Sequence, residues 1–274
     1  MSLLEAIVLG IVQGLTEFLP ISSTGHLRIV PAFLGWEDPG AAFTAVTQLG
    51  TLAAVLLYFR ADLLRIARAW TRSLTDRSLR SELDARLGWY ILLGTVPIGV
   101  FGLVFKDQIE TGARDLYLIG VALIALGLLL ALAERVGRRE RSIEQLGGRD
   151  GLWVGVAQAM ALVPGVSRSG ATITAGLFLG LDRPSAARFS FLLSVPAVVL
   201  SGLLELSSIV SGEEGEGTGF GDLAVATLLA FVSGYAAIAF LLRFLSSHST
   251  MIFVVYRVVL GALVLALVSA GAIE

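Results

Sequence analysis

Long apolar stretches alternate with short polar connections along the chain. Six stretches are apolar over the roughly 20 residues that a membrane-spanning helix needs, at 41–59, 87–105, 115–134, 185–206, 222–242 and 251–271. Two further apolar stretches, 2–35 and 151–181, are interrupted near the middle, at Pro20 and at Pro164-Gly165. Because proline removes a backbone donor and glycine permits a sharp reversal, each should form two half-length helices. We predict two re-entrant helical hairpins, which are tolerated at membrane depth when they are packed inside protein.

The pattern predicts an all-α polytopic membrane protein with six transmembrane helices plus two re-entrant hairpins. Hydrophobic residues make up 55% of the 274 residues and charged residues only 15%, whereas a soluble domain needs about a quarter charged residues. No segment resembles a separate soluble domain, so we expect a single membrane domain over 1–274. The chain has no cysteine, which excludes disulfides, thiolate metal sites and cysteine nucleophiles.

The two interrupted stretches contain copies of one segment, 145 positions apart. Residues 10–42 align without a gap with residues 155–187, with ten identities over 33 positions. The identities include Gly10, Gln13, Ser22 and Gly25, which fall on Gly155, Gln158, Ser167 and Gly170. Such a duplication with interrupted hydrophobic segments points to a site where the repeats meet. We expect repeat 1 over about 1–134, with hairpin 2–35, and repeat 2 over about 150–274, with hairpin 151–181.

The arginines predict how the repeats are oriented. They gather in two connections, as Arg60, Arg65, Arg68, Arg72, Arg77, Arg80 and Arg86 in 60–86, and as Arg135, Arg138, Arg139, Arg141 and Arg149 in 135–149. Two spans separate these connections, so both lie on one side, which the positive-inside rule makes the cytoplasm. The acidic 207–221 loop, with Glu213, Glu214 and Glu216, then lies outside. By this count hairpin 2–35 enters from outside and hairpin 151–181 from the cytoplasm, which makes the internal repeat inverted.

The first copy carries acid, hydroxyls and imidazole. Glu17 lies one helical turn after Gln13, so both project from one face. An ionisable group within the membrane marks function by default, although a solvated Glu at the outer interface remains an alternative. Gln13 alone is more typical of helix packing. Helix capping accounts for one hydroxyl of the following run, Ser22-Ser23-Thr24-Gly25-His26. Three hydroxyls and a histidine exceed what a cap requires, and neutral His26 can accept a proton near pH 7.

The second copy carries an arginine in the register of Ser23. Arg168 needs a partner inside an apolar hairpin, and its planar fork suits carboxylate or phosphate oxygens. A buried structural pair with Glu17 is the alternative. Two half-helix N-termini begin here, adding free N–H groups and partial positive charge. The expected donors to a phosphate are Ser22, Thr24, Ser167, Arg168, Ser169 and Gly170.

Glu17 would repel a bare phosphate unless a divalent cation joins them. Mg²⁺ and Ca²⁺ both prefer oxygen ligands, and Mg²⁺ is often held by one or two carboxylates together with substrate phosphates. We therefore expect dependence on Mg²⁺ or Ca²⁺, with Glu17 as ligand and Gln13 as a weak neighbour, and no complete protein-built cage.

At these residues the chain resembles the bacterial undecaprenyl-diphosphatase (bacitracin-resistance) family. The first family motif is matched by Gln13, Glu17, Pro20, Ser22, Ser23, Gly25 and His26. The second is matched by Pro164, Gly165, Ser167, Arg168, Ser169, Gly170 and Thr172. The likeness extends over essentially the whole chain, including the closing Tyr256-Arg257 segment.

The resemblance implies an enzyme that converts undecaprenyl diphosphate to the monophosphate carrier used in peptidoglycan assembly. It also implies a divalent cation, bacitracin resistance on overexpression, and an external active site in the bacterial cytoplasmic (inner) membrane. The expected partners are the lipid substrate and the membrane, with a homodimer as an option and no nucleic acid.

The residues and the resemblance lead to one hypothesis for the chemistry. Arg168, the helix N-termini and a cation at Glu17 neutralise the diphosphate. Ser23 is the candidate nucleophile, activated by His26, and direct attack by water with His26 as base is the alternative.

Two other functions compete with this hypothesis. Inverted repeats with broken helices are also a transporter architecture, so an anionic lipid could be carried or flipped by the same site. Acid-phosphatase-type lipid phosphatases need a histidine about six residues after their arginine, but Thr174 occupies that place. The reactive run opposite Arg168 favours an enzyme.

Overall fold

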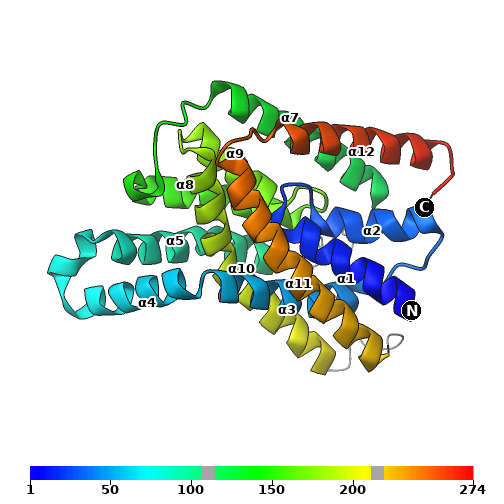
Figure 1. Ribbon diagram of the computed structural model, residues 1–274, viewed down its shortest axis with the longest axis horizontal. Helices are drawn as coiled ribbons and strands as arrows, with labels where there is room; N and C mark the ends of the chain where they lie inside the picture. The colour runs from blue at the N-terminus through cyan, green and yellow to red at the C-terminus, as the bar shows by residue number, and fades with distance from the viewer. Residues whose placement is uncertain (106–114, 211–218, 274) are drawn as a thin grey trace.

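The computed structural model describes residues 1–105, 115–210 and 219–273. Over these ranges the chain forms eleven α-helices and no strand, which confirms the predicted all-α class. The first half contains α1 (Leu3–Phe18), α2 (Ser23–Leu34), α3 (Gly40–Tyr58), α4 (Arg60–Thr75), α5 (Leu83–Val104) and α7 (Leu116–Val136). The second half contains α8 (Gly148–Ala159), α9 (Arg168–Phe178), α10 (Arg183–Val210), α11 (Phe220–Leu245) and α12 (Met251–Ser269). Figure 1 shows both termini at one end of the molecule and the α4–α5 connection at the other.

Five helices are long and apolar enough to cross a membrane, namely α5, α7, α10, α11 and α12. A sixth span is reached when α3 is counted together with α4, which continues it after a bend of 75°. The six predicted spans therefore all coincide with apolar helices. The 60–86 connection is itself mostly helical, because it contains α4 and a short 3-10 helix, Arg77–Ser81. The glutamates of the predicted acidic loop, at 213, 214 and 216, lie outside the described residues.

Both interrupted stretches form two half-length helices, as predicted. The break between α1 and α2 contains Pro20, and the break between α8 and α9 contains Pro164 and Gly165. The two ends of the second stretch lie together, because Arg141 binds both of them. Its guanidinium forms a 2.6 Å ion pair with Asp150 at the start of α8 and a 2.8 Å hydrogen bond to the carbonyl of Leu179 after α9. The hydrogen bond that Arg141 donates to Asp150 raises the pKa of the guanidinium, which therefore stays charged.

Each half-helix pair packs against the other half of the molecule. α1 packs on α11, and α8 packs on α5. Glycines allow both approaches, since a Cβ at Gly10 would lie 2.4 Å from the carbonyl oxygen of Ala226, and one at Gly155 would lie 2.4 Å from the Cα of Gly94. Small residues that let helix backbones touch are typical of membrane helix interfaces. The two duplicated segments are thus buried by equivalent contacts in opposite halves.

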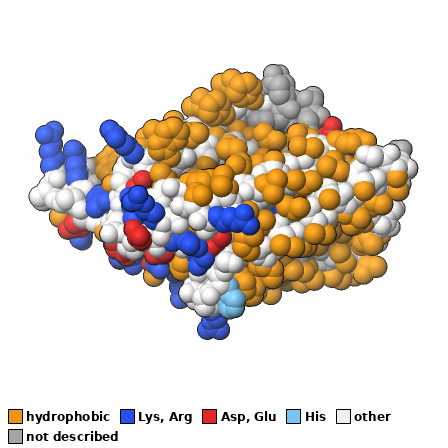
Figure 2. All heavy atoms as spheres, turned by 90° about the horizontal axis from the view of Figure 1, so that it is seen from above, with side chains coloured by type: hydrophobic (Ala, Val, Ile, Leu, Met, Phe, Trp, Pro, Cys, Tyr) orange, Lys and Arg blue, Asp and Glu red, His pale blue; other side chains and the backbone are white. Residues whose placement is uncertain are grey.

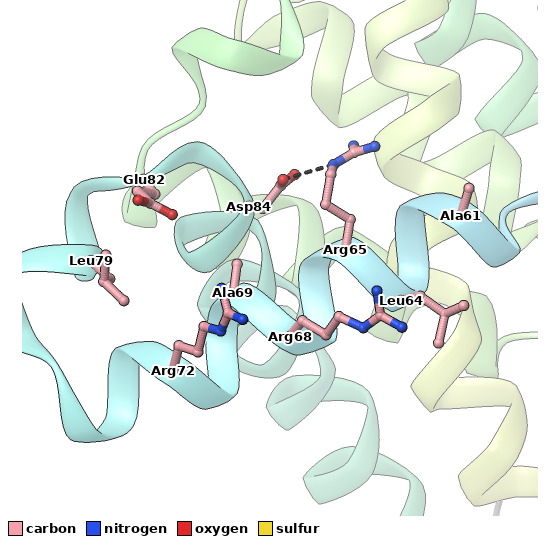
Figure 3. Close-up of a pocket in the computed structure, with 9 residues that line it drawn as sticks. All are labelled: Ala61, Leu64, Arg65, Arg68, Ala69, Arg72, Leu79, Glu82 and Asp84. Carbon is pink, nitrogen blue, oxygen red and sulfur yellow. Dashed lines mark hydrogen bonds and ion pairs between the residues drawn. The ribbon is translucent and has the colours of Figure 1, made fainter.

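Most charged side chains in Figure 2 lie in one half of the view, and apolar side chains cover most of the other half. Helix α4 carries a solvent-open pocket of about 550 Å³. Figure 3 shows Arg65, Arg68 and Arg72 along this helix, with Arg65 directed at Asp84, to which its Nε donates a 2.7 Å hydrogen bond. This distribution agrees with a multi-pass membrane protein whose α4 arginines lie on one side.

Candidate active site

The two helix breaks end in the same local structure. Ser22 caps α2 and Ser167 caps α9, and both have positive φ, at 77° and 71°. Each serine Oγ accepts a hydrogen bond from the amide three residues later, Gly25 at 3.3 Å and Gly170 at 3.1 Å. A non-glycine residue in this backbone region costs of order 1–3 kcal/mol, and such strain clusters at functional sites. The aligned positions of the two copies therefore fold alike.

Glu17 joins the two tips. Its Oε1 accepts a hydrogen bond from Nη2 of Arg168, the first residue of α9. Its Oε2 accepts one from Oγ of Ser23, the first residue of α2, at 2.6 Å. Nε2 of Gln13 also donates to Oε2, at 3.3 Å. The arginine and the hydroxyl that replace each other in the two copies therefore meet on one carboxylate. This buried pair is the arrangement that the sequence left open as an alternative to phosphate binding.

The tips also present unsatisfied backbone donors. Within the described residues the amides of Ser23, Thr24, Arg168 and Ser169 donate no hydrogen bond. First-turn amides lack an intrahelical acceptor, and the helix dipole makes such an end an anion site. The side chain of Ser169 instead donates to the carbonyl of Leu19 at 3.0 Å, so it links the second tip to the first. Two helix N-termini and one guanidinium can thus bind an anion between them.

His26 follows Ser23 on α2, but no hydrogen bond joins the two side chains in the described structure. Its Nδ1 lies 2.6 Å from the carbonyl oxygen of Ser22, which can only accept, so Nδ1 carries the proton. Its Nε2 lies 2.6 Å from the hydroxyl of Tyr256, and the two rings are almost parallel. In the neutral ring Nε2 is therefore the acceptor of the Tyr256 proton. The Ser23 hydroxyl binds Glu17 instead of His26.

Arg257 binds the backbone of both helix breaks. Its side chain is fully buried on α12, at 0% exposure, and no carboxylate within the described chain pairs with it. Its guanidinium donates to the carbonyl oxygens of Pro20 in the first break and of Gly165 and Val166 in the second, each at 3.1 Å. It also donates to two carbonyls of α7, those of Ala122 and Leu123. One side chain thus fixes both breaks to the helix α7.

Comparison with known proteins identifies the family. Residues 6–263 match the model of the family described as bacitracin resistance protein BacA. The chain belongs to the BacA family. It is 58% identical to an undecaprenyl-diphosphatase of Mycobacterium sp. (strain KMS), over 100% of this chain and 99% of that protein. It is 54% identical to the undecaprenyl-diphosphatase of Thermobifida fusca (99% and 92% covered) and 52% identical to undecaprenyl-diphosphatase 2 of Streptomyces coelicolor (100% and 97% covered).

In this BacA-family chain the oxygens near Glu17 fit a cation only with help from the substrate. The amide oxygen Oε1 of Gln13 is buried and has no hydrogen-bond partner among the described residues. It lies on the side chain that already contacts Glu17, so the two residues offer oxygen ligands of the kind that Mg²⁺ takes. No group of three or more His, Cys, Asp or Glu that could hold a metal occurs in the described chain.

Two residues of the BacA-family site were not singled out from the sequence as part of it. Tyr256 and Arg257 lie more than 230 positions from the first break, and the sequence showed them only as part of the family likeness. One signal was present for Arg257, because an arginine in the middle of the apolar stretch 251–271 requires a buried partner. Nothing in the local pattern identifies five carbonyls as that partner.

Proposed function

We propose that this chain hydrolyses undecaprenyl diphosphate to undecaprenyl phosphate and inorganic phosphate. The names of its relatives support the substrate, and membership in the BacA family supports a role in bacitracin resistance. The observation that carries the proposal is the meeting of Ser23, Arg168 and Glu17 at two helix N-termini with free amides. Hydrolysis of a diphosphate can use all of these groups. Cationic and N–H donors stabilise the phosphate oxygens, and a hydroxyl beside a carboxylate can act as the nucleophile. By returning the carrier lipid, the enzyme serves peptidoglycan synthesis and cell wall biogenesis.

Substrate binding begins with an exchange at Arg168. The guanidinium exchanges its single hydrogen bond to Oε1 of Glu17 for phosphate oxygens, two of which it can bind in bidentate geometry. The free amides of Ser23, Thr24 and Ser169 face the anion, and their partial positive charge neutralises what Arg168 does not. A divalent cation, when bound at the oxygens of Glu17 and Gln13, supplies further charge neutralisation. We propose Mg²⁺ or Ca²⁺ in that role.

Ser23 is the proposed nucleophile. Its Oγ attacks the terminal phosphorus, the bond to the bridging oxygen breaks, and undecaprenyl phosphate leaves. The proton of Ser23 has an acceptor in place, because Oε2 of Glu17 lies 2.6 Å from Oγ. Water then cleaves the phosphoserine to release inorganic phosphate. The alternative is direct attack by water with His26 as the base, and a phosphoserine trapped on Ser23 by rapid quench separates the two routes.

The function is tested by phosphate release from undecaprenyl diphosphate in detergent, with and without EDTA. Arg168→Ala should lower kcat/KM at least about 100-fold, because removing one donor to developing charge costs this much in other enzymes. Arg243→Ala is the matched control, since Arg243 is an exposed arginine at the end of α11. Phosphate release by Arg168→Ala at the wild-type rate would contradict the phosphate-binding role. Absence of phosphate release by the wild-type protein would contradict the proposed hydrolysis.

We further propose that the repeats have inverted topology in the cytoplasmic membrane, with the site open to the outside. The reciprocal packing of α1 on α11 and of α8 on α5 supports inversion, because equivalent elements then contact equivalent partners. The clamp of Arg141 on both ends of the second stretch supports a hairpin that returns to its side of entry. A homodimer is a separate prediction, which native mass spectrometry in detergent measures.

A further inference from the structure

An apolar groove runs along the outer face of α12. It has a volume of about 610 Å³, and its lining side chains all come from α12. Apart from Tyr256, these side chains are aliphatic or methionine, and Val255, Val259 and Leu263 are exposed by 57%, 61% and 46%. Because α12 is apolar enough to span the membrane, this face contacts the acyl region of the bilayer. The groove is therefore an open, lipid-facing surface without polar groups other than one phenol.

Tyr256 belongs both to this groove and to the active site. Its side chain is 43% exposed on the groove side, whereas His26, which its hydroxyl contacts at 2.6 Å, is only 5% exposed. The ring of Tyr256 therefore forms the wall between the lipid-facing surface and the buried imidazole. Tyr256 is thus the side chain that the groove and the site have in common.

The same contact covers the basic nitrogen of His26. Nδ1 is committed to the carbonyl of Ser22, so Nε2 is the nitrogen that can accept a proton. The hydroxyl of Tyr256 occupies Nε2 in the structure. Water or a phosphate hydroxyl can therefore reach Nε2 only after Tyr256 has moved.

We propose that the α12 groove holds the prenyl chain next to the diphosphate, and that Tyr256 is the gate that this chain displaces. This inference rests on the proposed function. The substrate has a charged head that belongs between the tips and an apolar tail that must remain in lipid, so it needs a sideways path between the two. The groove is continuous with the site through Tyr256 and matches an isoprenoid in being apolar along its length. The pocket on α4, which is lined by arginines and carboxylates, has the opposite character.

The test compares two substrates, undecaprenyl diphosphate and dimethylallyl diphosphate, which has one isoprene unit and cannot fill the groove. Val259→Asn places an amide in the groove and should raise KM for undecaprenyl diphosphate about tenfold, since burial of an apolar chain against an amide is unfavourable. KM for dimethylallyl diphosphate should not change. Val232→Asn is the matched control, because Val232 is 55% exposed on α11 and does not line the groove. Equal KM effects of the two asparagine variants on undecaprenyl diphosphate would overturn the groove.

The gate is tested with Tyr256→Phe, which keeps the ring and removes the hydroxyl. Because the short substrate cannot displace the tyrosine, loss of the hydrogen bond to His26 should help it most. We expect the ratio of kcat/KM for dimethylallyl diphosphate to that for undecaprenyl diphosphate to rise about fivefold, as one hydrogen bond allows. An unchanged or lower ratio would overturn the gate. If wild-type protein hydrolyses neither diphosphate, the proposed function itself fails, and the two failures are therefore distinguishable.

Discussion

At the scale of single residues, Glu17 connects the two helix breaks, because its carboxylate accepts hydrogen bonds from both Ser23 and Arg168. We propose that Ser23 is the nucleophile and that Arg168 binds the phosphate. In the structure Oε1 of Glu17 is bound to Arg168 and Oε2 to Ser23. A phosphate group that binds Arg168 as we propose therefore competes with Glu17 for the guanidinium. In the proposed reaction, the carboxylate balances the charge of Arg168 and opposes retention of the anionic product.

Glu17→Gln separates binding from hydrolysis. The variant keeps the shape of the side chain but removes its charge, so Arg168 becomes available to an anion. In EDTA, inorganic phosphate should bind about tenfold more tightly, since a charge-assisted hydrogen bond to Arg168 is worth roughly 1.5–3 kcal/mol. Isothermal titration calorimetry measures this, and hydrolysis should fall by at least about 100-fold.

The control is Glu5→Gln, because Glu5 lies on the same helix but only accepts from the backbone of Ser2. It should leave both measurements unchanged. Weaker phosphate binding by Glu17→Gln would show that the carboxylate supports anion binding, which contradicts the competition.

Arg257→Met tests the residue that holds both breaks. Methionine fills much of the same space but leaves the carbonyls of Pro20, Gly165 and Val166 without a donor. Each unsatisfied buried acceptor costs about 1–3 kcal/mol, so the thermal midpoint in detergent should fall by several degrees and phosphate release should be lost. Arg243→Met, on an exposed arginine, should do neither. A normal midpoint for Arg257→Met would mean that water replaces the guanidinium.

The sequence predicted residues that the structure brings together, but not how they are connected. Glu17, Ser23 and Arg168 could be found because charge and hydroxyls stand out in apolar stretches, and the repeat alignment places the last two in register. The contact of His26 with Tyr256 joins residues 230 positions apart. No local periodicity carries such information. The sequence therefore predicts that Ser23 pairs with His26, whereas in the structure Ser23 donates to Glu17 and His26 contacts Tyr256.

At the scale of helices, small residues decide how closely the half-length elements approach their partners. Gly10→Ala should separate α1 from α11, because its Cβ would lie 2.4 Å from a backbone oxygen of Ala226 that cannot move alone. We expect a thermal midpoint lower by several degrees, measured by unfolding in detergent. Gly99→Ala is the matched control, since a Cβ there has no atom within 4 Å and alanine favours the helix.

The helix breaks could be predicted because proline and glycine act locally, and both breaks contain the predicted residues. The helix α4 could not be found by a search for apolar spans. Its sequence carries four arginines and one aspartate among apolar residues, so the helix is amphipathic rather than apolar. Its direction follows from the 75° bend after α3, which no residue pattern specifies.

At the scale of the whole molecule, the absence of cysteine makes topology directly measurable. Glu37→Cys and Glu140→Cys are a matched pair of exposed positions, one after the first broken stretch and one before the second. If the repeats are inverted, a membrane-impermeant maleimide should label position 37 in intact spheroplasts and position 140 only after the membrane is opened. Labelling of both from one side would contradict inversion.

The reciprocal packing of the two halves also sets an order of events during synthesis. Helix α1 is synthesised first, yet its partner α11 follows about 200 residues later. Arg168, which pairs with Glu17, is added 151 residues after it. Since a chain is made from its N-terminus, helices α1 and α2 must reside in the translocation machinery or among lipids while the carboxylate of Glu17 lacks its counter-charge. The enzyme is therefore assembled only when the last helices are inserted, and a nascent chain that stalls before α9 carries an acidic helix without its counter-charge.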